Sequence, residues 1–388
     1  MKGADKMLKH LKNKEKNHRG RLFIMLASAI SFLLLLICSD IAIEYMKKGL
    51  KLCSTTVIPS LFPFMVISEL IVSSGLGRII GKALMKPARV LLGVSEGVAC
   101  AFILGAVCGF PIGARSVSSL LDCGEIDSRE ASSAMMFCNN PGSAFVISAV
   151  GTSLFGSARL GVMLYVCTLL SAVIVGRIGG LIMRAGSCEK KRETKSAPPL
   201  ARQESGAELF TTAIKSSAIS MLTVCALVAF FSALVGCVGD LLGRLGASEN
   251  LTAAIFCFFE LSSGVSAAAE MTSSPPSAIL LTAAALGWSG LSVHFQVMTV
   301  SSGRGISYKP YFLAKLAQGI VSATLAALSL KFLPFSEDVF KEISLNSPSK
   351  SYTNAAFVCL IFFFGAISPI FIDKICQKQC KKSKRKIF

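Results

Sequence analysis

Two long apolar blocks, residues 22–183 and 211–333, make up most of the chain, and a short charged segment at 184–210 separates them. Both blocks contain apolar runs that are long enough to cross a bilayer. Charged residues make up only 16% of the sequence, whereas soluble domains contain about 25%. Because helices satisfy their own backbone hydrogen bonds inside lipid, we expect an all-α, polytopic integral membrane protein.

Polar, glycine-rich sequences interrupt both blocks in the middle of apolar runs. The breaks lie at 109–115 and 139–143 in the first block, and at 260–264 and 287–290 in the second. Unwound backbone at membrane depth is stable only when it is buried in protein or lines a wet cavity. Broken helices in corresponding positions of two halves are typical of transporters that bind solute between the halves. The sequence therefore predicts broken helices and re-entrant hairpins around a solute site.

Basic residues are concentrated in the tail 1–21, the linker 184–210 and the tail 373–388. Positively charged segments beside membrane spans favour the cytoplasm and its anionic leaflet, so we expect both termini and the linker there, with the tails near lipid. Each half carries five apolar segments and must cross an even number of times, which requires one re-entrant segment per half. A polar loop at 334–352 precedes a final transmembrane helix at 353–372. The tails contain almost no aromatic residues, so the net charge of +18 does not indicate nucleic-acid binding.

The first break combines a small-residue ladder with a proline and an arginine. Gly105, Gly109 and Gly113 recur every four residues, a spacing that lets a neighbouring helix approach closely. Pro111 removes a backbone donor and opens the helix one turn earlier. Arg115 follows the break, where it either extends to the membrane interface or faces a cavity and binds a carboxylate or phosphate.

The second break predicts a helix start at membrane depth. Asn139 and Asn140 precede Pro141, and asparagine is a good N-cap while proline suits the first helical position. The free N–H groups of such a helix attract anions, and Ser143 adds a hydroxyl. The alternative interpretation is an ordinary turn at the interface.

In the second block, Glu260 lies in a run of phenylalanine and cysteine. A carboxylate in such surroundings is costly and usually functional. It can hold a proton, couple an ion or pair with Arg115. Ser262 and Ser263 follow it and add hydroxyls to the same break.

The last break, Gly-Trp-Ser-Gly, places Ser289 ahead of His294 and Gln296. The latter two can hydrogen-bond a heterocyclic ligand, or they can form an ordinary interhelical bond. A serine in this motif serves intramembrane proteolysis when a histidine on a distant helix activates it, but His294 is expected on the same helix. We therefore expect no enzyme, and the sequence predicts neither a metal site nor a cofactor.

Several of these motifs together resemble a known family. They are Pro59 to Phe64 with Ser68-Glu69-Leu70, then Gly109 to Arg115, and then Phe137 to Ser143 followed by Gly151. In this order they resemble the sporulation integral membrane proteins of the YlbJ type, a branch of the nucleoside-recognition or Gate family, which is related to concentrative nucleoside transporters. The resemblance implies two Gate-like repeats, a place in the outer forespore membrane, and movement of dipicolinic acid from the mother cell toward the spore.

The resulting functional prediction is a carrier for a small organic anion. Dipicolinate is a planar dianion, so helix N-termini near Asn139 and Ser143 and a cavity-facing Arg115 would suit its carboxylates, while His294 or Trp288 would contact its ring. A coupling ion, sodium or a proton, is expected, and the oligomeric state is open. The alternatives are a nucleoside transporter of the same family and a non-transporting scaffold for spore formation.

Overall fold

The computed structural model describes residues 22, 25–74, 76, 93–185, 206–271 and 275–332. All regular elements in this part of the chain are helical: α2 (Ser39–Leu52), the π-helix η1 (Cys53–Val57), α3 (Ile58–Ser73), α5 (Glu96–Cys108), α6 (Ile112–Asp122), α7 (Ser128–Cys138), the π-helix η2 (Phe145–Leu154), α8 (Ala158–Ala185), α9 (Gly206–Arg244), α10 (Glu249–Phe259), α11 (Leu261–Ala269), α12 (Pro275–Trp288), α13 (Gly290–Ser301) and α14 (Tyr308–Phe332). The predicted tails, polar loop and final helix, and most of the linker, lie outside these residues.

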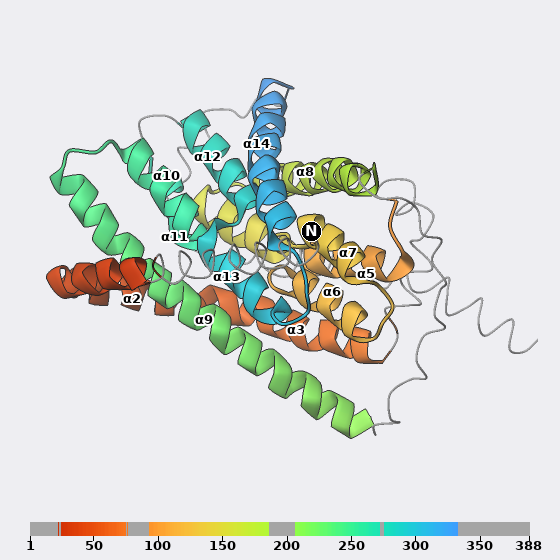
Figure 1. Cartoon of the computed structure of the whole chain (residues 1–388). Coiled ribbons are helices and arrows are strands. Elements are labelled where there is room, and N and C mark those ends of the chain that lie inside the picture. The colour runs from red at the N-terminus through yellow and green to blue at the C-terminus, as the bar shows by residue number, and fades with distance from the viewer. Residues whose placement is uncertain are drawn as a thin grey trace, which may run out of the picture.

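The helices follow the same order twice along the chain (Figure 1). In the first part, α3 is followed by the pairs α5–α6 and α7–η2 and then by the long helix α8. In the second part, the long helix α9 is followed by the pairs α10–α11 and α12–α13 and then by α14. Each pair is one apolar run that a short break divides. The order agrees with an internal duplication, which itself stays a prediction.

The structure confirms a break at each of the four predicted places. α5 ends at Cys108, and Gly109 adopts φ 84°, a left-handed conformation that glycine adopts without steric penalty. Glu260 is extended between α10 and α11. Ser289, with φ 82°, separates α12 from α13, and this conformation is unusual for a residue that carries a side chain.

The second break differs in detail from the prediction. α7 ends at Cys138, Asn139 is extended, and helical structure resumes only at Ser143. The two asparagines therefore do not cap the following helix. Their side-chain amides donate backward, from Asn139 to the Met135 carbonyl at 3.2 Å and from Asn140 to the Phe137 carbonyl at 2.7 Å. The physical reason is that the last turn of a helix leaves carbonyls without partners, and these amides satisfy them.

Four helical segments are long and apolar enough to cross a membrane, namely Ala158–Met183, Gly206–Arg244, Pro275–Ser301, which comprises α12 and α13 with the break at Ser289, and Tyr308–Phe332. A fifth span is obtained if Met25–Ile37 and Ser39–Thr55, which meet at 101°, are counted as one. These counts rest on length and composition within the described residues. Whether each half crosses an even number of times stays a prediction.

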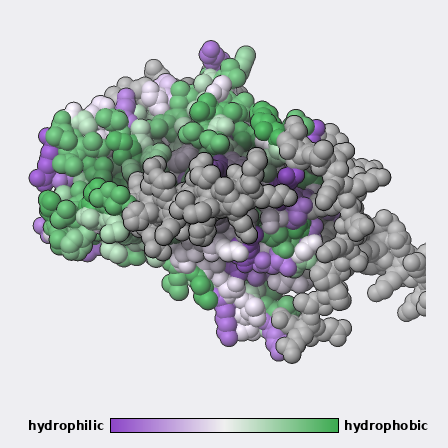
Figure 2. Space-filling view, viewed as in Figure 1, coloured by the Kyte–Doolittle hydropathy of each residue, from purple (hydrophilic) through white to green (hydrophobic). Residues whose placement is uncertain are grey.

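The distribution of side chains on α14 is inverted relative to a soluble helix. Leu313 and Ile320 are 70% and 64% exposed, whereas Lys315 and Gln318 are fully buried. Apolar residues likewise cover much of the left and upper part of the surface in Figure 2. A helix that exposes leucine and buries lysine is suited to lipid, where charged groups face the protein interior.

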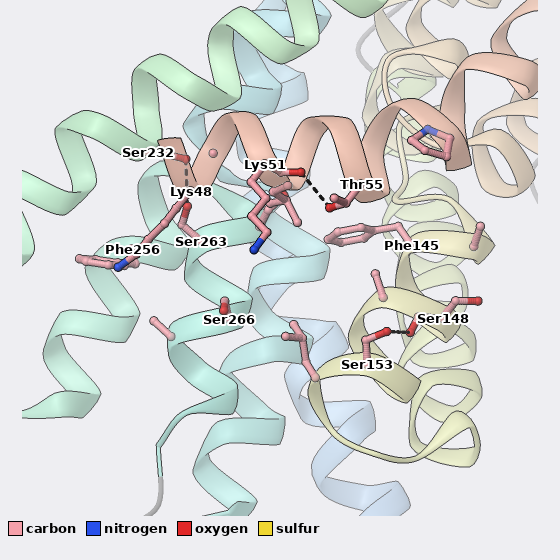
Figure 3. Close-up of a pocket in the computed structure, with 18 of the residues that line it drawn as sticks. Lys48, Lys51, Thr55, Phe145, Ser148, Ser153, Ser232, Phe256, Ser263 and Ser266 are labelled. Carbon is pink, nitrogen blue, oxygen red and sulfur yellow. Dashed lines mark hydrogen bonds between the residues drawn. The ribbon is translucent and has the colours of Figure 1, made fainter. Parts of the chain in front are cut away.

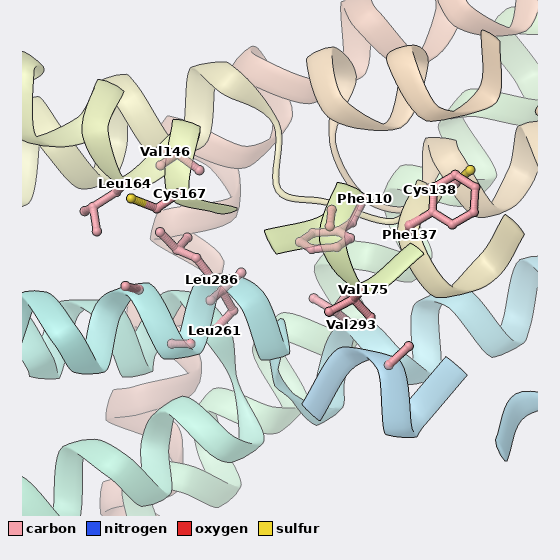
Figure 4. Packing of buried hydrophobic residues seen from close by; sticks show 14 of the residues in the cluster. Phe110, Phe137, Cys138, Val146, Leu164, Cys167, Val175, Leu261, Leu286 and Val293 are labelled. Carbon is pink, nitrogen blue, oxygen red and sulfur yellow. The ribbon is translucent and has the colours of Figure 1, made fainter. Parts of the chain in front are cut away.

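The core joins the two parts of the chain. Val146 and Leu164 lie in one buried cluster with Leu261 and Leu286, as Figure 4 shows. The predicted close approach of the glycine ladder is confirmed, because the Cys138 carbonyl lies so near Gly105 and Gly113 that a Cβ on either would collide with it. The end of α7 is therefore clamped between α5 and α6.

Candidate functional site

A cavity of about 670 Å³ lies between α2 with η1, the π-helix η2, and α11. Its volume is within the range of roughly 300–1,000 Å³ that is usual for small-molecule sites. Figure 3 shows side chains from these elements pointing into one space. Elements from both parts of the chain thus build a single pocket.

Both π-helices line this cavity, η1 through Thr55 and η2 through residues that include Phe145 and Ser148. A π-helix widens the turn, and such segments occur frequently at functional sites. In η2 a side-chain hydrogen bond has the same five-residue spacing as the π-helical backbone bonds: Ser153 Oγ donates to the carbonyl of Ser148, five residues earlier, at 3.1 Å. The irregular backbone is therefore concentrated at the cavity wall.

The cavity carries cationic side chains from α2. The Lys51 side chain points from α2 into the space between α11 and η2 (Figure 3). Within the described part of the chain its ammonium group has no hydrogen-bond or ion-pair partner. Lys48 also lines the cavity but pairs with Glu44 at 2.7 Å. Of the two lysines in the described lining, Lys51 is thus the one that remains available to a ligand.

Hydroxyl and aromatic groups complete the wall. The hydroxyl side chains are Thr55, Ser143, Ser148, Ser153, Ser232, Ser262, Ser263 and Ser266, and the aromatic ones are Tyr45, Phe64, Phe145 and Phe256. Glu270 is the carboxylate in the lining. A free ammonium, several hydroxyls and aromatic faces together can hold a small anion that contains a ring.

Three of the predicted site residues, Ser143, Ser262 and Ser263, line the cavity. They come from the starts of the second members of two broken pairs, one in each part of the chain. The other predicted residues lie elsewhere, and most of them are buried in the protein: Gly109, Pro111, Gly113, Arg115, Asn139, Asn140, Glu260, Ser289, His294 and Gln296.

Arg115 binds a carboxylate of the protein itself. Its Nε lies 2.9 Å from Glu69 on α3, and its other nitrogens donate to Ser216 and Ser220 on α9. The sequence left open that Arg115 faces a cavity and binds a carboxylate or phosphate there, or that it pairs with Glu260; the carboxylate that it binds in the structure is Glu69 of the protein itself. Arg115 therefore connects α6 to α3 and α9 instead of facing the cavity.

Glu260 satisfies the start of α11. Its two carboxylate oxygens accept from the backbone N–H groups of Ser262 at 3.0 Å and Ser263 at 2.6 Å. A carboxylate at a helix N-terminus is stabilised both by these bonds and by the helix dipole. Ser262 and Ser263 are held at the cavity wall by this cap.

Ser289, His294 and Gln296 are buried and do not line the cavity. His294 Nδ1 lies 2.7 Å from the Tyr311 hydroxyl, so this nitrogen forms an interhelical bond, one of the two roles that the sequence left open. Trp288 donates from Nε1 to the Phe258 carbonyl at 3.0 Å and stacks on that ring. Across the described residues, no group of three or more His, Cys, Asp or Glu side chains is placed to hold a metal ion.

A second buried network joins α14 to the break after α7. Lys315 Nζ donates to the Asn139 carbonyl and to Gln318 Oε1, both at 2.8 Å. Gln318 Nε2 donates to Asn140 Oδ1 at 2.9 Å and to the Thr168 carbonyl at 3.3 Å. The unwound segment is thus held by side chains from the other part of the chain.

Lys51, Lys315 and Gln318 are not among the residues that the sequence predicts for the site. A signal for Lys315 was present, because a lysine in the middle of an apolar run is an intramembrane charge and by default a functional candidate. Lys51 gave no such signal, since it lies at the edge of an apolar run, where lysine is ordinary. Its position in the cavity depends on how α2 packs against α11 and η2.

The fold and the cavity define an α-helical, multi-pass membrane protein with broken helices around a solute-sized pocket. In sequence, the chain is similar to the sporulation integral membrane protein YlbJ of Bacillus subtilis (strain 168). The two are 27% identical over 382 residues, which covers 85% of this chain and 90% of the relative. No family model matches the chain, and no solved structure matches it.

Proposed function

We propose that the protein is a membrane carrier for a small organic anion, and that dipicolinic acid is its solute during spore formation. The observation that carries this proposal is the cavity of about 670 Å³, in which the Lys51 ammonium has no partner among the residues that the structure describes. In this proposal the chain has two Gate-like repeats, and the cavity lies where their broken helices meet.

The chemistry of the cavity favours an anion with a ring. The Lys51 ammonium supplies a charge-assisted hydrogen bond to one carboxylate. The hydroxyls of Ser148 on η2 and Ser266 on α11 supply neutral donors, and Phe145 and Phe256 offer flat apolar faces to the ring. A neutral nucleoside would leave the Lys51 charge without a partner, which makes it the weaker candidate.

The sporulation role rests on the likeness to a sporulation integral membrane protein over most of both chains. In this proposal the protein lies in the outer forespore membrane, with both termini in the mother cell. The remaining alternative is a scaffold that organises spore formation without moving a solute. Such a scaffold has no need for a cation in a pocket of this size.

The test is uptake of labelled dipicolinate into liposomes that contain the purified full chain. We expect uptake above that of protein-free liposomes, and no competition by an excess of nucleosides. Replacing Lys51 by glutamine should weaken apparent affinity by about tenfold, since a hydrogen bond to a charged group contributes about 1.5–3 kcal/mol.

Lys47→Gln is the matched control, because Lys47 lies on the same helix and does not line the cavity. It should transport like the wild type. Absence of uptake by folded wild-type protein would favour the scaffold, and competition by nucleosides would favour the nucleoside carrier. Equal effects of the Lys47 and Lys51 substitutions would remove the cavity from the solute path.

A further inference from the structure

Lys315 on α14 is a charged residue that the cavity does not use. Its side chain is completely buried, and among the described residues no carboxylate pairs with it. Removing an ammonium group from water without a counter-ion is energetically unfavourable. Ionisable groups that are kept in membrane segments despite this cost mark ion and proton pathways.

The ammonium group is bound by the carbonyl end of a broken helix. α7 ends at Cys138, and the Asn139 carbonyl that accepts from Lys315 Nζ at 2.8 Å is the first beyond it. Broken transporter helices use carbonyls of this kind to coordinate a coupling cation, and the helix dipole favours positive charge there. Lys315 Nζ therefore occupies a position that suits a bound monovalent cation.

The same short segment leads directly to the cavity. Asn139 and Asn140 contact the Lys315–Gln318 network, and Ser143, three residues after Asn140, lines the cavity. Nζ also lies 5.8 Å from the centroid of the Phe110 ring in the first break. A change of charge on Lys315 would thus act on both breaks of the first part of the chain.

We propose that Lys315 is the ion-coupling group of this carrier, holding on Nζ a proton that takes the place of a bound sodium ion. This inference rests on the proposed function. In the coupling step the ammonium releases one proton to water and becomes a neutral amine. Its bond to the Asn139 carbonyl weakens, and the segment that leads to Ser143 is released. Rebinding of the proton restores the bond.

Other titratable side chains surround this network. His294 of α13 and Tyr311 of α14 form a hydrogen-bonded pair one turn away. α7 contributes Cys138 next to the Asn139 carbonyl, and α8 contributes Cys167 next to the Thr168 carbonyl. α12, which packs closely on α14, carries no titratable side chain. None of these groups is a carboxylate that could neutralise Lys315.

The experiment measures labelled dipicolinate in liposomes in two modes: exchange of internal for external solute, and accumulation driven by an imposed ion gradient. For the wild type we expect a pH gradient of one sign to drive accumulation, and replacement of all sodium by potassium to change nothing. Lys315→Arg should keep exchange and lose accumulation, because a guanidinium group does not release its proton. Lys309→Arg, on the exposed start of the same helix, should behave like the wild type.

Accumulation driven by a sodium gradient in the wild type would overturn the proposal without any variant. So would a pH-driven response of Lys315→Arg equal to that of the wild type. If Lys315→Arg does not fold, as judged by size-exclusion chromatography, Lys315→Gln takes its place with the same expectation. Exchange by the wild type without any response to pH would overturn the coupling role alone, whereas absence of exchange would overturn the carrier function and this inference with it.

Discussion

The break after α7 and the break before α11 both leave backbone groups at a helix end without helical partners, and side chains of opposite charge bind these groups. At the first, a cation from another helix, Lys315, binds a carbonyl at the negative end of α7. At the second, an anion within the break, Glu260, binds two N–H groups at the positive end of α11. Both ions complement the dipole of the helix that they bind.

The difference lies in where the ion comes from. Glu260 is two and three residues from the groups that it binds, so its bonds persist as long as α11 does. Lys315 reaches across 176 residues of chain, so its bond depends on how α14 lies against α7. We infer that the second break is a fixed part of the cavity wall, and that the first is the one that moves.

The largest effect on stability is expected at Gly113, where α5 and α6 enclose the end of α7, just before the break that we infer to move. Gly113→Ala places a Cβ against the Cys138 carbonyl, which is backbone and cannot rotate away. We expect destabilisation of about 3 kcal/mol or more, because overpacking against rigid groups is at the upper end of its usual range. The measurement is the thermal unfolding midpoint of the purified protein in detergent, with the yield of monodisperse protein.

Gly243→Ala is the control, because nothing lies within 4 Å of a Cβ built on that exposed helical glycine. It should leave the midpoint unchanged or raise it slightly. A midpoint for Gly113→Ala that equals this control would show that α7 is not clamped between α5 and α6.

The next largest effect on stability is expected at Glu260, and it distinguishes the role of Glu260 from that of Lys315. Glu260→Ala removes the acceptor for two N–H groups, and we expect a loss of about 2 kcal/mol of stability. Glu260→Gln should recover part of it, since its side-chain oxygen still accepts. Neither substitution should abolish the response of transport to a pH gradient, in contrast to Lys315→Arg.

Thermal unfolding measures the loss of stability, and the liposome assay measures the response of transport to a pH gradient. Glu249→Gln, an exposed carboxylate in the first turn of α10, is the control for stability. If Glu260→Gln removed the pH response while Lys315→Arg kept it, the assignment of fixed and moving breaks would be reversed.

The smallest effect is expected outside the breaks, at the contact between Arg304 and Asp122. Arg304 Nε lies 2.8 and 2.9 Å from the two carboxylate oxygens of Asp122, and the hydrogen bond from Asp122 raises the pKa of the guanidinium group. Both side chains are partly exposed, so Asp122→Asn should cost about 1 kcal/mol or less. The shift in unfolding midpoint should shrink further in high salt, and a shift as large as that of Glu260→Ala would contradict this ranking.

The sequence alone predicts the class of fold and the positions of the breaks, because glycine, proline and polar residues inside an apolar run interrupt a helix locally. The sequence alone does not predict which side chains bind to one another across each break. Arg115 binds Glu69 rather than Glu260, and Asn139 caps the helix before it, because both outcomes depend on which helices pack together. Ser143, Ser262 and Ser263 line the cavity because they adjoin the breaks, and their role in binding stays a prediction, whereas Lys51 reaches the cavity only through tertiary packing.

The most direct test asks whether two distant breaks line one solvated pocket. In a protein whose native cysteines have been replaced, Ser143→Cys and Ser263→Cys should both react with a membrane-impermeant thiol reagent, and dipicolinate should protect both. Ser171→Cys, fully buried on α8, should not react. Failure of both cavity positions to react, or reaction that dipicolinate does not slow at either, would contradict a shared solute cavity.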